Sequence, residues 1–347
     1  MTNHWSTAPR GEVIRLEHHS RLLERNPLGD AATRELAAYL PPGHDLEPTR
    51  RYPVIWVLAG YTGTGGMLEN QGAWSPPLSR RMDQLIAAGC PPVILALPDC
   101  FTRLGGSQYL DSSATGPYRS YLLEELVPLV DARFPTLPHR DHRGVMGKSS
   151  GGYGALCLGL EAADTFGAVA CHSGDMYFEP CYGVDFPRVA RAIPREEELL
   201  PWLERLERQE KREWTDLSVL NILCMAACYS PSESRPPPLA LDLPFELHTC
   251  EIRPQVFARW LARDPVRMLE DPACQEALRS LHLLYVDCGL RDEFHLQFGA
   301  RILARRLREL GLPHQHEEFD DGHRSLNYRY DRSLPLLARA LSPAGSA

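Results

Sequence analysis

Lysine and long apolar segments are both scarce in this chain of 347 residues. Only Lys148 and Lys211 among the 37 basic residues are lysines, and acidic residues outnumber basic ones to give a formal net charge of −8. Because an acidic protein is poorly matched to nucleic acid or to an anionic membrane, we expect neither as a partner. No apolar run approaches the roughly 20 residues of a membrane-spanning helix. The amino terminus also lacks the basic-then-apolar pattern of a secretory signal.

The cysteines are too scattered to form a disulfide framework. Ten cysteines are a small fraction of a chain this long, and several lie within apolar runs. This distribution favours buried free thiols in a reducing compartment, so we expect a cytoplasmic protein. Cys224 and Cys228 stand one helical turn apart, but no histidine or second cysteine pair completes a metal site. We expect neither a metal nor a cofactor.

Strand and helix patterns alternate along most of the chain. Tyr52–Gly60 and Pro92–Pro98 are continuous apolar runs, which is typical of strands that are buried on both faces. Alternation of this kind predicts an α/β fold, with a mostly parallel sheet flanked by helices. The other expected strands are Val13–Leu23, Thr33–Leu40, Arg143–Met146, Phe166–Cys171, Leu281–Val286 and His316–Phe319, and the expected helices are Ser79–Ala88, Tyr118–Phe134, Ser150–Leu160, Phe294–Leu310 and Ser325–Leu341.

The alternation breaks once, between Met176 and Asp271. This stretch contains amphipathic and apolar helical patterns and a proline-rich link, Ser230–Pro244, but no strand pattern. An insertion of this length between core strands usually covers a ligand site. We therefore expect one α/β domain over residues 1–347 with a helical cap at 176–271. The alternative is a helical elaboration that only enlarges the core.

The clearest chemical motif is Gly147-Lys148-Ser149-Ser150-Gly151. It follows an expected strand and opens an expected helix, and this is the context in which G-x-S-x-G indicates a nucleophilic serine. Small residues on both sides allow a strained turn that presents the hydroxyl of Ser149. A phosphate-binding loop also contains Gly-Lys-Ser, but it requires a glycine where this chain has His142. We therefore predict that Ser149 is the nucleophile.

A serine nucleophile needs a general base, and the base needs an acid that orients it. In the α/β-hydrolase order the acid and then the histidine follow the serine along the chain. His323 comes directly after the last expected core strand and is the candidate base. Asp292 lies a turn beyond the preceding strand and is the preferred acid. The alternatives are Asp287 at the strand end, which we expect to bond within its own loop, and Asp175; Glu293 is adjacent to the preferred acid.

The glycine-rich loop after the Tyr52–Gly60 strand is the second half of an expected oxyanion site. Ala59-Gly60-Tyr61-Thr62-Gly63-Thr64-Gly65-Gly66 lets backbone amides approach a ligand closely. The two donors would be the backbone N–H groups of Tyr61 and of Ser150, the residue after the nucleophile. The alternative is a flexible turn without a role in catalysis.

Together these segments resemble the “Putative esterase” family of α/β-hydrolases, which includes esterase D (S-formylglutathione hydrolase), enterochelin-type esterases, feruloyl esterases and mycolyltransferases. The resemblance covers roughly Tyr52–Leu341 apart from the expected cap. It implies the nucleophile at Ser149, the acid at Asp292, the base at His323, and oxyanion amides at Tyr61 and Ser150. The matching segments are YPVIWVLAGYTGTGG, PPVILALPDC, GSQYLDSSATGPYRSYLLEELVPLVDARF, GVMGKSSGGYGAL, DCGLRDEF and FDDGHRSLNY.

We therefore expect a serine carboxylesterase that acts on a small-molecule ester. Thioester hydrolysis and acyl transfer use the same groups and stay open, as does a catalytically silent binding protein of the same fold. Gly60, Leu223 and Met225 are the residues that we expect to contact substrate, the latter two from the apolar segment Leu217–Tyr229 of the cap. The sequence leaves the oligomeric state open, a homo-oligomer included.

Overall fold

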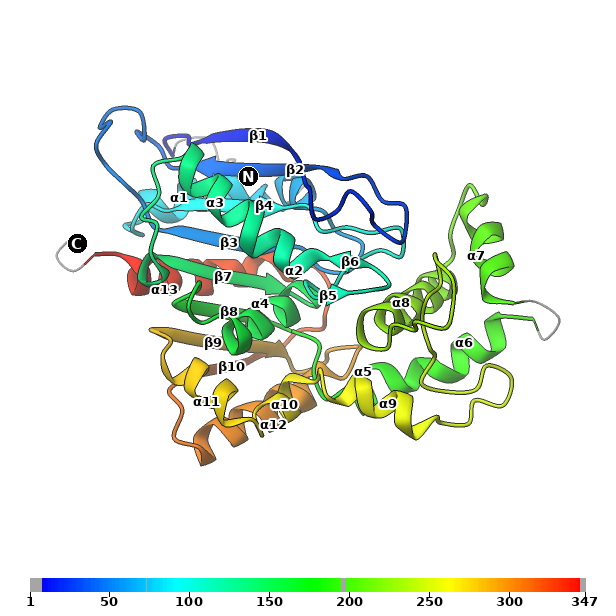
Figure 1. The fold of residues 1–347 in the computed structure, drawn as a ribbon. Coiled ribbons are helices and arrows are strands. Elements are labelled where there is room, and N and C mark those ends of the chain that lie inside the picture. Colours follow the sequence, from blue (N-terminus) through cyan, green and yellow to red (C-terminus); the bar gives the residue numbers. More distant parts are fainter. Residues whose placement is uncertain (1–7, 73, 195–197, 344–347) are drawn as a thin grey trace.

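A single eight-stranded sheet forms the centre of the molecule in the computed structural model, which describes residues 8–72, 74–194 and 198–343 (Figure 1). The strand order is β1-β2-β4-β3-β7-β8-β9-β10. The strands are β1 (Glu12–His19), β2 (Thr33–Leu40), β3 (Val54–Leu58), β4 (Ile94–Pro98), β7 (Arg143–Lys148), β8 (Ala168–His172), β9 (Leu283–Gly289) and β10 (Gln315–Phe319), and β5 (Asp111–Ser112) pairs with β6 (Gly116–Pro117) outside the sheet.

The sheet is mostly parallel, as the sequence predicts. β1 pairs with β2 and β2 with β4 in antiparallel fashion, and every later pairing from β4 to β10 is parallel. All residues of β3, β4, β8 and β9 are buried, whereas the edge strands β1 and β10 are partly exposed. Apolar runs therefore form the centre of the sheet, and its carboxyl edge collects the loops that follow β3, β7, β8, β9 and β10.

Helices cover both faces of the sheet. α1 and α13 pack with one buried cluster of core residues, and α3, α4, α11 and α12 pack with the other. The helices outside the expected cap are α1 (Leu78–Ala87), α2 (Tyr118–Ser120), α3 (Val127–Arg133), α4 (Ser150–Glu161), α11 (Pro272–Arg279), α12 (Leu296–Glu309) and α13 (Tyr330–Leu341).

The expected helix Tyr118–Phe134 contains an irregularity that the sequence analysis did not predict. Tyr121–Leu126 adopts π-helical geometry between α2 and α3. Pro128 lies just beyond this segment and has no N–H for the preceding turn. A widened turn is one way for a continuous helical segment to accommodate such a residue.

The segment 176–271 folds as helices that lie beyond the ends of the strands rather than on a face of the sheet (Figure 1). It ends at Asp271, whose side chain caps α11, the helix that leads into β9. The helices in that position, beyond the strand ends, are α5 (Phe178–Tyr182), α6 (Phe186–Ala192), α7 (Leu199–Glu207), α8 (Trp214–Tyr229) and α9 (Pro254–Leu261). The short helix α10 (Pro265–Met268) also belongs to the segment but packs against α4 and α12. The buried residues on several sides of α8 explain its nearly continuous apolar sequence.

All ten cysteines are free thiols, and nine of them are buried. In the part of the chain that the structure describes, no helix combines the length and the apolar character needed to cross a membrane.

Candidate active site

Ser149 occupies a strained turn between β7 and α4. Its backbone has φ 59° and ψ −126°, a region that a residue with a side chain rarely adopts, and its N–H donates to the carbonyl of His172 at 2.9 Å. Strain of this kind persists only where the surrounding structure enforces it. The turn puts the serine at the carboxyl edge of the sheet, at the amino terminus of a twelve-residue helix.

Two glycines make this turn sterically feasible. A Cβ at Gly151 would lie 2.1 Å from the carbonyl oxygen of Leu58 in β3, and a Cβ at Gly147 would lie 2.4 Å from the backbone of Gly151. No other residue fits either position without a backbone shift. The two glycines of the motif are thus required by the close approach of β3, β7 and α4.

His323 forms a short hydrogen bond with Asp292. Its Nδ1 lies 2.7 Å from Oδ2 of Asp292, and both residues are buried, with 5% and 3% of their surface exposed. Oδ1 of Asp292 accepts the backbone N–H of Phe294 at 2.9 Å. The carboxylate therefore has a fixed orientation and can hold the imidazole in the tautomer whose Nε2 is free to accept a proton.

The residues directly after Asp292 hold the same histidine from other sides. The carboxylate of Glu293 accepts the backbone N–H of His323 at 2.5 Å, and the ring of Phe294 packs edge-on against the imidazole with centroids 4.7 Å apart. A Cβ on Gly322 would lie 2.8 Å from the Glu293 carboxylate, so a larger residue before the histidine would displace this carboxylate. Asp292, Glu293 and Phe294 thus fix the ring, the backbone and one ring face of His323.

The two alternative acids lie in different surroundings. Asp287 is fully buried and bonds to His172, Tyr285 and Arg329 at 2.8, 3.0 and 2.8 Å, so its partners come from β8, β9 and the segment before α13. The expectation that it bonds within its own loop is wrong, because the carboxylate points across the sheet. Asp175 bonds to other groups, which are described below, and neither acid is hydrogen-bonded to His323.

The amides of Tyr61 and Ser150 are suited to bind an anion. Among the described residues, neither N–H has a hydrogen-bond acceptor, whereas those of Thr62 and Gly63 donate to backbone carbonyls. Tyr61 is held by its hydroxyl, which donates to the carbonyl of Leu104 at 2.9 Å. Free amides at a helix amino terminus and in the adjacent loop are the usual components of an oxyanion hole.

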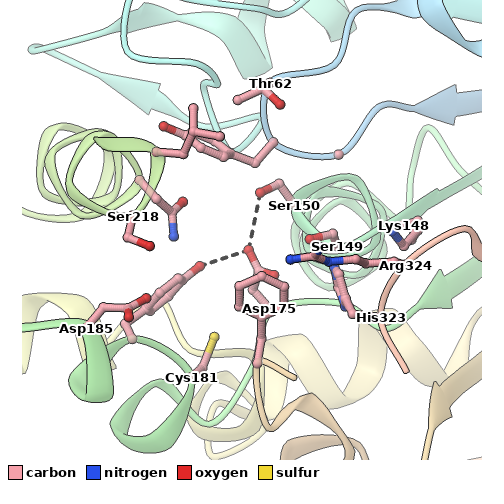
Figure 2. A pocket seen from close by; sticks show the side chains of 16 residues that line it. Thr62, Lys148, Ser149, Ser150, Asp175, Cys181, Asp185, Ser218, His323 and Arg324 are labelled. Atoms are coloured by element: carbon pink, nitrogen blue, oxygen red, sulfur yellow. Dashed lines mark hydrogen bonds between the residues drawn. The ribbon is translucent and has the colours of Figure 1, made fainter. Parts of the chain in front are cut away.

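A cavity of about 290 Å³ brings these groups together (Figure 2). Ser149, His323, Tyr61, Ser150 and Gly60 all line it, which places five of the predicted site residues on one surface. Its size suits a small substrate. The remaining lining residues are Thr62, Lys148, Asp175, Cys181, Tyr182, Asp185, Leu217, Ser218, Asn221, Phe294 and Arg324.

Leu223 and Met225, the predicted substrate contacts on the cap, do not line this cavity. Both are fully buried in α8, where they pack within the main apolar core. The helix meets the cavity through Leu217, Ser218 and Asn221 instead. The prediction was wrong because α8 is apolar on most of its surface, so its hydrophobic pattern does not identify the face that meets the cavity.

A family model described as “Putative esterase” matches residues 31–331. The chain belongs to this family. Among curated proteins, two Mycobacterium tuberculosis relatives, Esterase Rv1288 and Esterase MT1326, are each 30% identical to it over 141 residues. That alignment covers 39% of this chain but only 28% of either relative, so the chain matches less than a third of their length.

The fold of this esterase-family chain is shared with solved structures at low sequence identity. A ferulic acid esterase superimposes with a TM-score of 0.63 at 20% identity, over 95% of this chain and 99% of that one. An S-formylglutathione hydrolase from Agrobacterium tumefaciens gives 0.59 at 18% identity, over 97% and 98%. FphF, a fluorophosphonate-binding serine hydrolase from Staphylococcus aureus, gives 0.58 at 14%, over 95% and 99%. These likenesses establish the α/β-hydrolase fold.

The sequence analysis missed several cavity residues of this family member. Ser218 and Asn221 are polar positions three residues apart in the otherwise apolar stretch of α8 that begins at Leu217, and that spacing could have indicated the face that meets the cavity. Asp185 and Phe294 carried no comparable signal, because their place in the cavity depends on how the loops fold. Asp175 was considered only as an alternative acid.

Proposed function

We propose that this chain is a serine carboxylesterase that hydrolyses a small ester through an acyl-enzyme. The observation that carries the proposal is the arrangement at one cavity of a strained serine, a histidine bonded to a buried aspartate, and two free backbone amides. Membership in an esterase family supports the same reaction class.

The reaction begins when Ser149 Oγ attacks the ester carbonyl. Nε2 of His323 takes the hydroxyl proton, and the carboxylate of Asp292 stabilises the imidazolium that forms. The carbonyl oxygen becomes an oxyanion that accepts hydrogen bonds from the N–H groups of Tyr61 and Ser150. The tetrahedral intermediate then collapses, the C–O bond to the alcohol breaks, and His323 gives its proton to the leaving oxygen.

Water completes the cycle. His323 removes a proton from a water molecule that attacks the acyl-enzyme carbonyl, and the same two amides stabilise the second oxyanion. Collapse of this intermediate releases the carboxylic acid and returns the proton to Ser149. A thiol leaving group or an acceptor alcohol in place of water would use the same groups, so paired oxygen ester and thioester substrates of one acyl group would determine the preferred leaving group.

The segment 176–271 acts in this proposal as a cap that closes the substrate cavity. Leu217, Ser218 and Asn221 of α8 and Cys181, Tyr182 and Asp185 of the α5 region form the wall opposite the carboxyl edge of the sheet. The ten free thiols support a reducing, cytoplasmic location for the enzyme.

A fluorophosphonate probe tests the proposal directly. Only an activated serine reacts with this reagent, so the wild-type protein should be labelled, and peptide mass spectrometry should locate the adduct on Ser149. Ser149→Ala should not be labelled, whereas Ser150→Ala, which keeps the backbone amide, should be. Labelling of the Ser149→Ala protein at the wild-type rate would refute the assignment, and an unlabelled wild type would favour a silent binding protein.

A further inference from the structure

Asp175 presents one unused carboxylate oxygen to the substrate cavity. It follows β8 and is 7% exposed, and it lines the cavity with Ser149. All three of its hydrogen bonds fall on Oδ2, from Gln108 Nε2 at 3.1 Å, Tyr182 Oη at 2.9 Å and Ser150 Oγ at 3.3 Å. Figure 2 shows the bonds from Tyr182 and Ser150. No described residue donates a hydrogen bond to Oδ1.

This carboxylate also has no close cationic partner. No arginine, lysine or histidine of the described residues forms an ion pair with Asp175, although Lys148 and Arg324 belong to the same cavity wall. His323 and Lys148 interact with its charge only at longer range. Burial raises the pKa of Asp175, and the hydrogen bonds from Gln108 and Tyr182 oppose that rise. Oδ1 is not among the fully buried unpartnered atoms, so it is open to the cavity. A ligand that displaces water from this oxygen must supply a hydrogen-bond donor in its place.

The wall of α8 adds further polar groups to the same cavity. Within the described residues, neither the hydroxyl of Ser218 nor the side-chain amide of Asn221 has a protein hydrogen bond. Asp185, the other buried acid of the cavity, differs from Asp175 because its Oδ1 accepts from Arg188 at 2.6 Å. Asp175 is therefore the buried acid of this cavity whose charge is not paired with an arginine among the described residues.

We propose that Oδ1 of Asp175 accepts a hydrogen bond from the substrate, so that the enzyme prefers esters carrying a hydroxyl or ammonium group over apolar esters of the same shape. This inference rests on the proposed esterase function and specifies its substrate class. The preference is strongest for an ammonium group, because a hydrogen bond between two charged groups is stronger than one with a neutral donor.

The Asp175→Asn variant should reverse this preference. Gln108, Tyr182 and Ser150 all donate toward the position of Oδ2, so the single amide oxygen of asparagine must stay there. Its NH₂ group then takes the place of Oδ1 and faces the cavity as a donor. A site that accepted hydrogen bonds becomes one that donates them, and an ammonium group is repelled rather than bound.

Matched esters measure this effect. Methyl esters of isovaleric, β-hydroxybutyric and β-aminobutyric acid place a methyl, a hydroxyl and an ammonium at the same position, and acetates of the corresponding alcohols do so on the leaving side. In at least one series, wild-type kcat/KM should be highest for the ammonium ester, by roughly 10- to 100-fold over the methyl analogue. In Asp175→Asn that order should invert, whereas Asp185→Asn, the matched buried acid, should keep it.

Equal wild-type kcat/KM values for the three esters in both series would overturn the inference without any variant. A preference for the ammonium ester that persists in Asp175→Asn would also overturn it. Fluorophosphonate labelling separates this failure from failure of the esterase proposal. A wild type that is labelled and hydrolyses all analogues equally lacks only the Asp175 subsite. A wild type that is neither labelled nor active refutes both.

Discussion

The molecule contains two buried aspartate–histidine pairs that differ little in local geometry. Asp292 and His323 are 2.7 Å apart, and Asp287 and His172 are 2.8 Å apart. In the second pair the other ring nitrogen of His172 lies 2.8 Å from the hydroxyl of Ser333, so a serine, a histidine and an aspartate are linked in the order of a catalytic triad. By hydrogen bonds alone, the second arrangement is more complete than the first, because no hydrogen bond joins Ser149 to His323 among the described residues.

Their surroundings separate the two pairs. His172, Asp287 and Ser333 have at most 1% of their surface exposed, and none of them lines the cavity. The carboxylate of Asp287 is shared with Arg329, a permanent cation that competes with an imidazolium for its charge. Ser333 lies inside helix α13, which also contains Pro335, and not at a strand–helix turn with positive φ. Access to a ligand, a strained turn and nearby free amides thus distinguish a candidate catalytic serine, and hydrogen-bond order does not.

Substitution of Ser149 and of Ser333, the serines of the two arrangements, should give the largest difference in activity. Ser149→Ala should lower kcat by about 10⁴-fold or more, because the members of a triad act as a unit. Ser333→Ala should leave kcat nearly unchanged and lower stability by about 1 kcal/mol for one lost buried hydrogen bond. Ester hydrolysis and thermal melting of both variants measure this contrast. An inactive Ser333→Ala beside an active Ser149→Ala would exchange the roles of the two pairs.

Substitution of Asp292 should mainly lower activity, whereas substitution of Asp287 should mainly lower stability. Asp292→Asn should reduce kcat by roughly 10⁴-fold, because asparagine favours the wrong imidazole tautomer. Asp287→Asn should instead destabilise the fold by several kcal/mol, up to about 3–5, because a buried partner, Arg329, loses its carboxylate. Steady-state kinetics with chemical denaturation checks both. Reversed outcomes would assign the orienting acid to Asp287, and two near-normal enzymes would point to Asp175.

Glu317, which shares Arg329 with the Asp287–His172 pair, should make the stability of the fold depend on pH in the acid range. Burial alone would raise its pKa, but hydrogen bonds from Arg332, Arg329 and Tyr285 outweigh burial and lower the pKa from 4.5 to about 2. A lowered carboxyl pKa stabilises the fold above about pH 4.5, and this contribution is lost as the pH falls toward 2. Glu317→Gln should therefore destabilise the protein at neutral pH by about 1 kcal/mol, since the group is partly exposed.

Denaturation across a pH series gives the sign of the Glu317 effect. The difference between wild type and Glu317→Gln should be constant near neutrality and shrink between pH 4.5 and about 2. A difference that is independent of pH would mean that the ion pairs with Arg329 and Arg332 contribute nothing to stability.

The two faces of α8 should give the smallest effect on activity. Leu217 lines the cavity, so Leu217→Ala should shift the preference among acyl chain lengths by up to about 10-fold, since a methylene in an apolar pocket is worth about 1–3 kcal/mol. Leu223→Ala and Met225→Ala should lower the melting temperature and leave that preference flat, because both residues are buried in the core. Equal profiles for all three variants would mean that α8 has no part in the substrate pocket.

Much of the fold could be predicted from the sequence, because its signals are local. The apolar runs that form β3 and β4 and the glycine pattern around Ser149 each depend on neighbouring residues only. The position of the helical insertion was predictable for the same reason, since it interrupts a regular alternation. The π-helical segment Tyr121–Leu126 was not, because helical periodicity hardly changes when one turn widens.

The partners of buried polar groups could not be predicted, because they come from distant segments. His172 bonds to Asp287 and Ser333, which are 115 and 161 residues away in the sequence. No spacing rule connects such positions, and the same is true of Asp175 and Gln108. His323 could be identified only because the order of strands in an α/β fold determines which loops reach the carboxyl edge of the sheet.

The contacts of Asp292, Glu293 and Phe294 with His323 determine when the histidine becomes ordered. Because these residues are consecutive and lie in the loop before α12, the acid and the base form one rigid body that exists before any substrate arrives. The conformational entropy of ordering the histidine is lost when the chain folds, and none of it has to be lost again at each turnover. A shift of α8 would therefore leave the alignment of His323 and Asp292 unchanged.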